Sequence, residues 1–268
     1  MGEENKIRDA VDAATGLVKA VPVYEDVVQP AAKEIGAGLK TVAKTVHIAL
    51  APVSALVWGF EQIKEFVGTS VAKRLEKIPN EKIITPPAQI AGPALEALKY
   101  TGHEETLREM YGKLLATAMN ADQVASAHPG FVEIIKQLSP DEARICKLFK
   151  DSDAFPTIDL NLKGEGKDDG SYKLILPHYA LVGFDAGCVH PHFIQRYLDN
   201  LARLGIVEIP ATGFVTISNK EAYKPLENAP QILQIKERFS KQGNKVEVAY
   251  GIVRRTPFGI AFIEACID

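Results

Sequence analysis

The stretch from Ile83 to Glu142 reads IITPPAQIAGPALEALKYTGHEETLREMYGKLLATAMNADQVASAHPGFVEIIKQLSPDE and carries the strongest helix signals of the 268-residue chain. The Pro86-Pro87 pair excludes a helix that runs in from upstream, because proline lacks an N–H and restricts the residue before it. Gly92-Pro93 predicts a helix start with proline at the first position, and Gly102 predicts its end. The stretch therefore opens with one short helix between two breaks.

Two further helices and a new start follow in the same stretch. Thr101 and Glu104 have the spacing of a capping box, which predicts the start of the next helix. Its apolar residues recur at three- and four-residue steps and so share one face: Leu107, Met110, Tyr111, Leu114, Leu115 and Ala118. After Pro129 the pattern repeats in Phe131, Ile134, Ile135 and Leu138. Ser139 to Glu142 is a second capping box, with proline at the first helical position and acids in the first turn.

Upstream of this stretch the chain is rich in small residues and reads as helical. Residues 5–21 and 24–50 each place apolar side chains on one helical face, and proline and glycine interrupt the second. Val46–Phe60, VHIALAPVSALVWGF, is the most apolar run. It is shorter than the roughly 20 apolar residues that a membrane span needs, and a buried core helix kinked at Pro52 is the preferred interpretation. An interfacial helix that inserts on activation is the alternative.

The residues that would make this membrane contact come from the apolar run. They are Leu50, Val53, Leu56, Val57, Trp58 and Phe60. The aromatic residues Trp58 and Phe60 are typical anchors of a protein core, which agrees with the preferred interpretation of the run as a core helix.

Downstream of Ser139 helices and strands alternate. Residues 157–163 and 172–176 predict two strands, and the GEGKDDG segment between them predicts a hairpin loop rather than a phosphate-binding loop. Pro191 predicts the start of a helix that Gly205 ends. IVEIP and FVTI predict short strands, and Thr256-Pro257 predicts the cap of a last helix. Residues 227–245 are compatible with a helix or with a long wing.

The order of these elements predicts a winged-helix-like module. We expect a mainly α fold with a smaller α+β part, in which an N-terminal helical bundle spans residues 1–138 and a C-terminal winged-helix-like α+β domain spans residues 139–268. The helical stretch from Ile83 then joins the two.

Composition and charge limit the possible function. The chain is 46% apolar and 24% charged with a net charge of −3, which is typical of a globular protein without a nucleic-acid-binding charge signature. Three widely spaced cysteines fit a reduced cytosol better than a disulfide framework. The acidic N-terminus MGEENKIRDAVDAA lacks the pattern of a signal peptide, so we expect a cytoplasmic protein.

The amino-acid sequence of the central stretch resembles that of a known family. IITPPAQIAGPALEALKYTG, HEETLREMYGKLLATAMN and AHPGFVEIIKQLSPDEA are similar to the central block of the Abi-alpha (abortive infection alpha) family, and LAPVSALVWGFEQIKEF upstream is similar too. The resemblance covers roughly residues 25–142 well and the C-terminal half less distinctively. It implies a role in bacterial phage defence, and the family brings no catalytic residues to carry over.

A DNA-binding or partner-binding surface would lie on the predicted module. Its candidates are Gln195, Arg196, Arg203, Arg254 and Arg255, with Lys241 and Lys245 beside them. Asp199 on the same helical face opposes phosphate contact, and DNA-binding modules usually carry a basic surface. We therefore expect contact with a protein partner or self-association, and we keep a DNA-binding regulator as an alternative.

No catalytic, cofactor or metal site is predicted. Asp185, Cys188, His190 and His192 are metal-ligand types, but they lack the spacing of a known zinc motif and read as a loop that enters a helix. No serine-nucleophile motif or paired carboxylate stands out. The sequence therefore predicts a non-enzymatic defence protein acting through protein contacts, with a membrane-acting effector and a DNA-binding regulator as alternatives.

Overall fold

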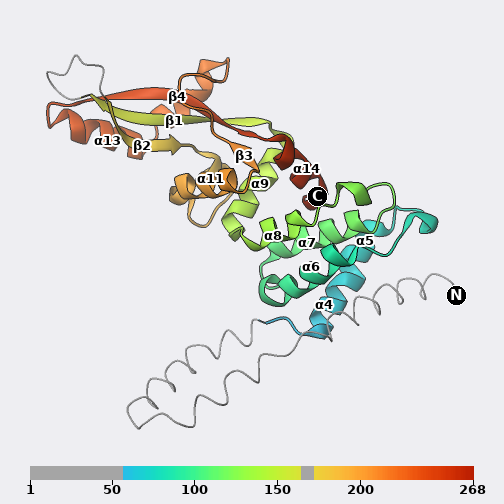
Figure 1. Cartoon of the computed structure of the whole chain (residues 1–268). Helices are drawn as coiled ribbons and strands as arrows, with labels where there is room; N and C mark the ends of the chain where they lie inside the picture. The colour runs from blue at the N-terminus through green and yellow to red at the C-terminus, as the bar shows by residue number, and fades with distance from the viewer. Residues whose placement is uncertain (1–56, 164–171) are drawn as a thin grey trace, which may run out of the picture. The chain divides into compact units, whose positions relative to one another are not determined.

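A computed structural model describes residues 57–163 and 172–268, which divide into two units. The first holds the residues up to Gln137 together with Asp268, and the second is Leu138–Ile267. The described chain is mainly helical, with one small antiparallel sheet of four strands (Figure 1). The predicted helices of residues 5–50, most of the Val46–Phe60 run and the GEGKDDG loop lie outside the described residues.

The first unit is built from packed helices. These are α4 (Phe60–Phe66), a π-helical segment η2 (Val67–Val71), α5 (Ala72–Leu75), α6 (Ala88–Thr101), α7 (Glu105–Ala118) and α8 (Gly130–Lys136). The predicted faces of α7 and α8 are confirmed, because all their apolar members are buried. The main chain between α5 and α6 also bridges to the end of α7, through Ile83 and Asn120.

Two start signals of this unit were wrong. Helix α6 begins at Ala88 with Pro87 as its N-cap, so Pro93 lies inside the helix and not at its first position. Pro93 is the sixth residue of α6, beyond the first turn, so its missing N–H removes one intrahelical hydrogen bond. Helix α7 has Glu104 as its N-cap with no side-chain bond, since the Thr101 hydroxyl donates instead to the Ala97 carbonyl at 2.9 Å.

Gly102 ends α6 as predicted, but for a different reason. Its φ is −60°, so the position needs no left-handed conformation. A side chain there would overlap the ring of Trp58. The main-chain N–H of Trp58 also donates to the Lys99 carbonyl at 2.8 Å. Gly112 on α7 similarly lets the Phe66 ring approach, because a Cβ there would lie 2.8 Å from it. The missing side chains of Gly102 and Gly112 therefore make room for the Trp58 and Phe66 rings.

The second unit combines helices with the sheet. Its elements are α9 (Pro140–Asp151), β1 (Ala154–Lys163), β2 (Tyr172–Tyr179), α10 (Val182–Asp185), the turn η5 (Pro191–Phe193), α11 (Ile194–Arg203), β3 (Val207–Glu208), α12 (Lys224–Glu227), α13 (Pro230–Ser240), β4 (Lys245–Arg255) and α14 (Pro257–Cys266). The strand order is β2-β1-β4-β3, with antiparallel neighbours throughout.

Local signals at three helix ends of this unit are confirmed. Ser139 and Glu142 form the predicted capping box, Gly205 ends α11 with φ +74°, and Thr256 caps α14 by accepting from the Gly259 N–H at 2.8 Å. The predicted FVTI strand is wrong, since residues 214–217 form turns and loop. In this region β3 covers only Val207–Glu208 and pairs with the end of β4. The ambiguous residues 227–245 contain helix α13.

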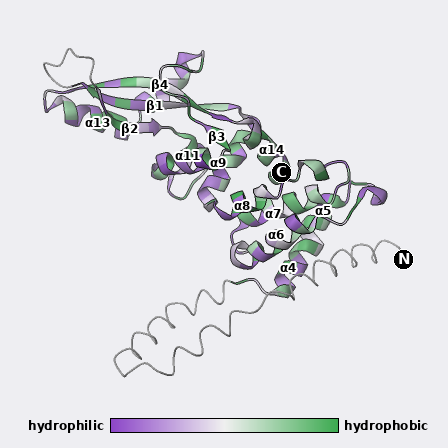
Figure 2. Cartoon of the chain, viewed as in Figure 1, coloured by the Kyte–Doolittle hydropathy of each residue, from purple (hydrophilic) through white to green (hydrophobic). Residues whose placement is uncertain are grey.

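The sheet packs its apolar side chains against α12 and α13. The buried cluster consists of Ile158, Leu160, Tyr179, Tyr223, Leu226, Ala229 and Ile232. Hydrophobic and hydrophilic residues are mixed along β1 and β4 (Figure 2), as expected for strands with one covered face. This packing fixes the sheet, and the sheet and α9 position the helix pair α10–α11.

Candidate functional site

The segment that leads into α11 is held by one buried carboxylate. Asp141, in the first turn of α9, is 5% exposed and accepts hydrogen bonds from the main-chain N–H groups of Val189 and His190, both at 2.9 Å. The Tyr197 hydroxyl donates to it at 3.0 Å, and Arg144 donates at 2.6 Å. One side chain therefore ties α9, the α10–α11 connection and α11 together.

Asp141 is ionised at neutral pH because of these bonds. Burial by itself would raise the pKa of Asp141, but the donors from Val189, His190, Tyr197 and Arg144 outweigh it and lower the pKa below the usual value. The same carboxylate, after burial, raises the pKa of Tyr197 to about 12. The phenol is thus a hydrogen-bond donor at neutral pH, and Asp141 ties the connection to α9 and α11.

The α10–α11 connection carries exposed aromatic side chains. Phe184, Val189 and Phe193 are exposed by 41%, 66% and 43%. The rings of Phe184 and His192 meet edge-on at 5.3 Å, and those of His190 and Phe193 lie 5.7 Å apart. The Arg196 guanidinium sits 4.3 Å above the Phe193 ring. We call these six residues, Phe184, Val189, His190, His192, Phe193 and Arg196, the aromatic patch.

The patch has the composition of a protein-binding surface. Aromatic residues and arginine are enriched at the centres of such interfaces because they combine a large apolar area with few rotatable bonds or with planar hydrogen bonding. The rings already contact one another, so little side-chain freedom would be lost on binding.

The five residues predicted from sequence as contact residues divide into two groups. Gln195, Arg196 and Arg203 lie on α11, whose opposite face is buried through Ile194, Tyr197, Leu198 and Leu201. Arg196 joins the aromatic patch, while the Arg203 guanidinium donates to the Asn200 side chain at 2.7 Å.

The other two lie at the end of β4 and are already paired. The Arg254 guanidinium lies 2.5 Å from the Glu208 carboxylate, and Arg255 forms an ion pair with Asp153. Their positive charge is offset locally, which weakens a phosphate-binding role. The structure brings neither into contact with the aromatic patch.

The metal-ligand types near α11 serve other contacts. Within residues 57–163 and 172–268, no three His, Cys, Asp or Glu side chains are grouped so that they could hold a metal ion. The Cys188 thiol lies 3.5 Å from the Asp141 carbonyl, and burial raises its pKa to about 11. His190 and His192 pack on the rings of the aromatic patch.

The predicted membrane-contact residues are only partly described. Leu50, Val53 and Leu56 lie outside the described residues. Trp58 packs edge-on against Phe66 at 6.0 Å, and the Arg108 guanidinium lies 5.4 Å from the Trp58 ring. Across the part of the chain that the structure describes, no helix combines the length and apolarity needed to cross a membrane.

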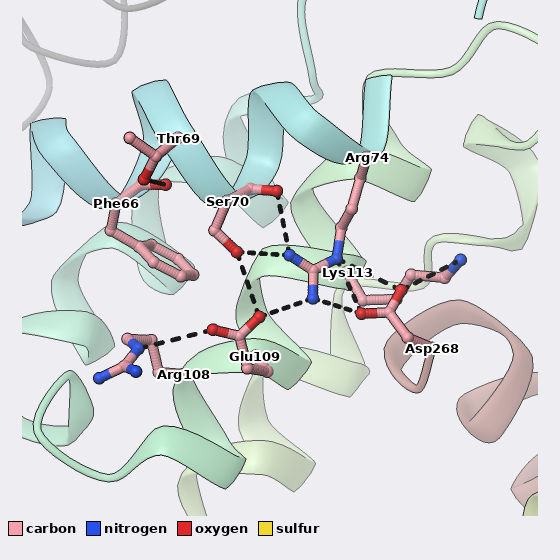
Figure 3. A network of polar contacts seen from close by, with 8 residues as sticks. All are labelled: Phe66, Thr69, Ser70, Arg74, Arg108, Glu109, Lys113 and Asp268. Atoms are coloured by element: carbon pink, nitrogen blue, oxygen red, sulfur yellow. Dashed lines mark hydrogen bonds and ion pairs between the residues drawn. The ribbon is translucent and has the colours of Figure 1, made fainter. Parts of the chain in front are cut away.

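A second polar cluster lies in the first unit, around the π-helical segment (Figure 3). Arg74 donates to the Glu109 carboxylate at 2.7 Å, to the Ser70 carbonyl at 3.0 Å and to the Asp268 carboxylate at 2.9 Å. The Ser70 hydroxyl donates to Glu109 at 3.1 Å. Lys113 lies 3.8 Å from Asp268.

This cluster reads as structural. The π-helical turn directs Ser70 and Arg74 toward α7, and the positive and negative side chains satisfy one another. Burial alone would lower the pKa of Arg74, but the carboxylates of Asp268 and Glu109 raise it, so the guanidinium stays charged. The Ser70 hydroxyl donates to a carboxylate that Arg74 already pairs with, which fits the same structural role.

Sequence reasoning missed most of the patch. It identified Arg196 but weighed His190 and His192 only as metal ligands, and it left out Phe184, Val189 and Phe193. The available signal was the apolar content of the loop FDAGCVHPHF, since loop residues that need no burial are usually polar. Asp141 was recognised only as a first-turn acid, because its partners lie about fifty residues away in the chain.

Comparison with known proteins gives one family and one similar solved structure. A solved structure of an uncharacterized protein from the marine bacterium Alcanivorax borkumensis SK2 is similar at 20% identity over 50% of this chain and 89% of that one, with a TM-score of 0.36. No curated protein matches. The family described as abortive infection alpha matches residues 59–266 and so extends through both units. The chain therefore belongs to the abortive infection alpha family.

Proposed function

We propose that this protein acts in phage defence through protein contacts made by the aromatic patch on a winged-helix-like second unit. Membership of the abortive infection alpha family supports the defence role. The observation that carries the contact role is a group of exposed rings, in which Phe184 packs on His192 and Phe193 packs on His190 under the Arg196 guanidinium.

The winged-helix-like description is supported by the order and pairing of the elements. Helix α9, strand β1, the helix pair α10–α11 and strands β3 and β4 follow one another in the chain, and β4 lies between β1 and β3 in the sheet. In such modules the second helix of the pair is the recognition helix. Here α11 holds that place, and the patch extends from α10 through the connection to Arg196 in the first turn of α11. Strand β2 and helices α12 and α13 are additions to the basic arrangement.

Charge favours a protein partner over DNA. Arg196 is engaged by the Phe193 ring, Arg254 and Arg255 are paired with carboxylates, and Asp199 is exposed on α11. A DNA-reading surface needs several free cations that face phosphates on both sides of a groove. The patch offers rings and one arginine instead.

The experiment is a plaquing assay with a broad phage panel in cells with and without the gene. The proposal expects fewer plaques or smaller plaques with the gene for at least one phage. Purified protein passed over immobilised duplex DNA at low and high salt separates the DNA alternative, because phosphate-dominated binding falls steeply with salt. Equal plaquing for every phage contradicts the defence role, and salt-dependent retention on DNA contradicts the choice of a protein partner.

A further inference from the structure

The junction of β1 and β2 contains a strained histidine. Ile158 pairs with Tyr179 and Leu160 pairs with Leu176, so that Asp159 alone faces the two residues Pro177 and His178. This is a β-bulge, a feature over-represented beside functional sites. His178 has φ +48°, which is rare for a residue other than glycine and persists only where the surrounding structure fixes it.

The Asp159 carboxylate is what fixes it. The side chain of Asp159 is buried, and its Oδ1 accepts the His178 main-chain N–H at 2.7 Å. The His178 imidazole Nδ1 lies 3.4 Å from the same oxygen, an ion-pair distance when the ring is protonated. At the bulge, one carboxylate oxygen therefore accepts a main-chain hydrogen bond and lies beside the imidazole of the same residue.

The second oxygen of Asp159 holds a loop. Oδ2 accepts the Thr212 hydroxyl at 2.8 Å, and the adjacent Gly213 N–H donates to the Tyr250 carbonyl at 2.8 Å. The position opposite is Gly251, where a Cβ would lie 2.8 Å from Thr212. Phe214, next in the loop, is 87% exposed. These contacts hold the base of the loop, residues 209–217, on the sheet.

Two carboxylates face the His178 ring, and they come from different elements. Asp159 lies on β1 and Asp199 lies on α11. The loop contributes only the uncharged Thr212. Bonding to Asp159 raises the pKa of His178, burial opposes the rise, and the negative charges of Asp159 and Asp199 add to it. The pKa of His178 in the folded protein consequently lies above the ordinary histidine value.

We propose that Asp159, His178 and Thr212 form a proton-dependent clamp that holds the base of loop 209–217 on the sheet. The protonated ring neutralises the buried Asp159 and stabilises the bulge, and the bulge presents Asp159 to Thr212. A group with a raised folded pKa stabilises most below its unfolded value and loses that contribution as pH rises through the folded pKa. The clamp therefore holds in mild acid and loosens at alkaline pH. This inference is independent of the aromatic patch.

Amide exchange of Gly213, measured by NMR on the full chain and corrected for intrinsic exchange, tests the clamp. The measured pH range runs from about 5.5 to about 8.5, on both sides of the ordinary histidine pKa. Wild-type protection is expected to fall as pH rises, by about tenfold for each pKa unit that separates the held loop from the free loop.

Two variants separate the clamp from a general pH effect. His178→Asn keeps a side chain that tolerates positive φ and a main-chain donor to Asp159 but cannot titrate, so its Gly213 protection should be independent of pH. His103→Asn is the control, because His103 is an exposed histidine 3.6 Å from Glu104 in the other unit. It should behave as wild type. Protection that is flat in wild type, or that falls equally in His178→Asn, overturns the proposal.

Discussion

Replacement of Asp141 by alanine tests the most connected side chain of the second unit. The variant removes the acceptor of four hydrogen bonds, from Val189, His190, Tyr197 and Arg144. Hydrogen bonds to a charged group contribute about 1.5–3 kcal/mol each. Val189 and His190 are exposed, so water can replace their bonds, whereas the buried Tyr197 hydroxyl is left without its acceptor. We therefore expect a loss of about 3 kcal/mol, the equivalent of two bonds.

The assay follows the unfolding of the two units separately. The single tryptophan of the chain, Trp58, reports the first unit, while far-UV circular dichroism reports both. In Asp141→Ala the dichroism transition should shift down by about 10 °C and the fluorescence transition should stay in place. The matched control is Asp151→Ala, because Asp151 is an exposed acid on the same helix.

The stability difference between wild type and Asp141→Ala should depend on pH. The folded pKa of Asp141 is lowered, so its stabilisation is present above the unfolded value of about 4 and is lost as pH falls through the folded pKa. The difference between wild type and Asp141→Ala should therefore shrink in acid. A variant that unfolds like Asp151→Ala at neutral pH, or a difference that persists in strong acid, would refute the reasoning.

Three further substitutions have definite expectations. Gly102→Ala should destabilise the first unit by about 1–3 kcal/mol and shift Trp58 fluorescence, because the new Cβ meets the Trp58 ring, whereas Gly92→Ala on the same helix has open space and should be neutral or slightly stabilising. Thr256→Ala should lower the dichroism transition through the loss of the α14 cap, about 1 kcal/mol. Arg74→Met should cost about 1 kcal/mol in urea unfolding followed by fluorescence, with a smaller difference at high salt, because its carboxylate partners are partly exposed.

The features that could be predicted from sequence are those encoded by neighbours in the chain. Ser139 and Glu142 lie three residues apart, so one turn of helix brings them together whatever the tertiary structure. The apolar face of α7 and the Thr256 cap are equally local. Such signals identified the family stretch and most helices.

The features that could not be predicted depend on long-range contacts. Asp141 becomes a structural centre only because residues 189–197 fold back on it. The pairing of β1 with β4 joins segments about ninety residues apart, and the single-residue offset at Asp159 is decided by the bulge. The start of α6 was wrongly predicted at Pro93, because the helix already begins directly after Pro87. The aromatic patch was missed because the spacing of residues predicts helix and strand periodicity but not which side chains of a loop are exposed.

The most direct test of the proposed contact compares two double variants in the plaquing assay. Phe193→Ala with Arg196→Ala removes the centre of the aromatic patch, and Arg254→Ala with Arg255→Ala removes the paired arginines at the end of β4. Circular dichroism confirms that each protein is folded. The account predicts that the first variant loses protection against phage and the second keeps it. Full protection by the first variant would contradict the account.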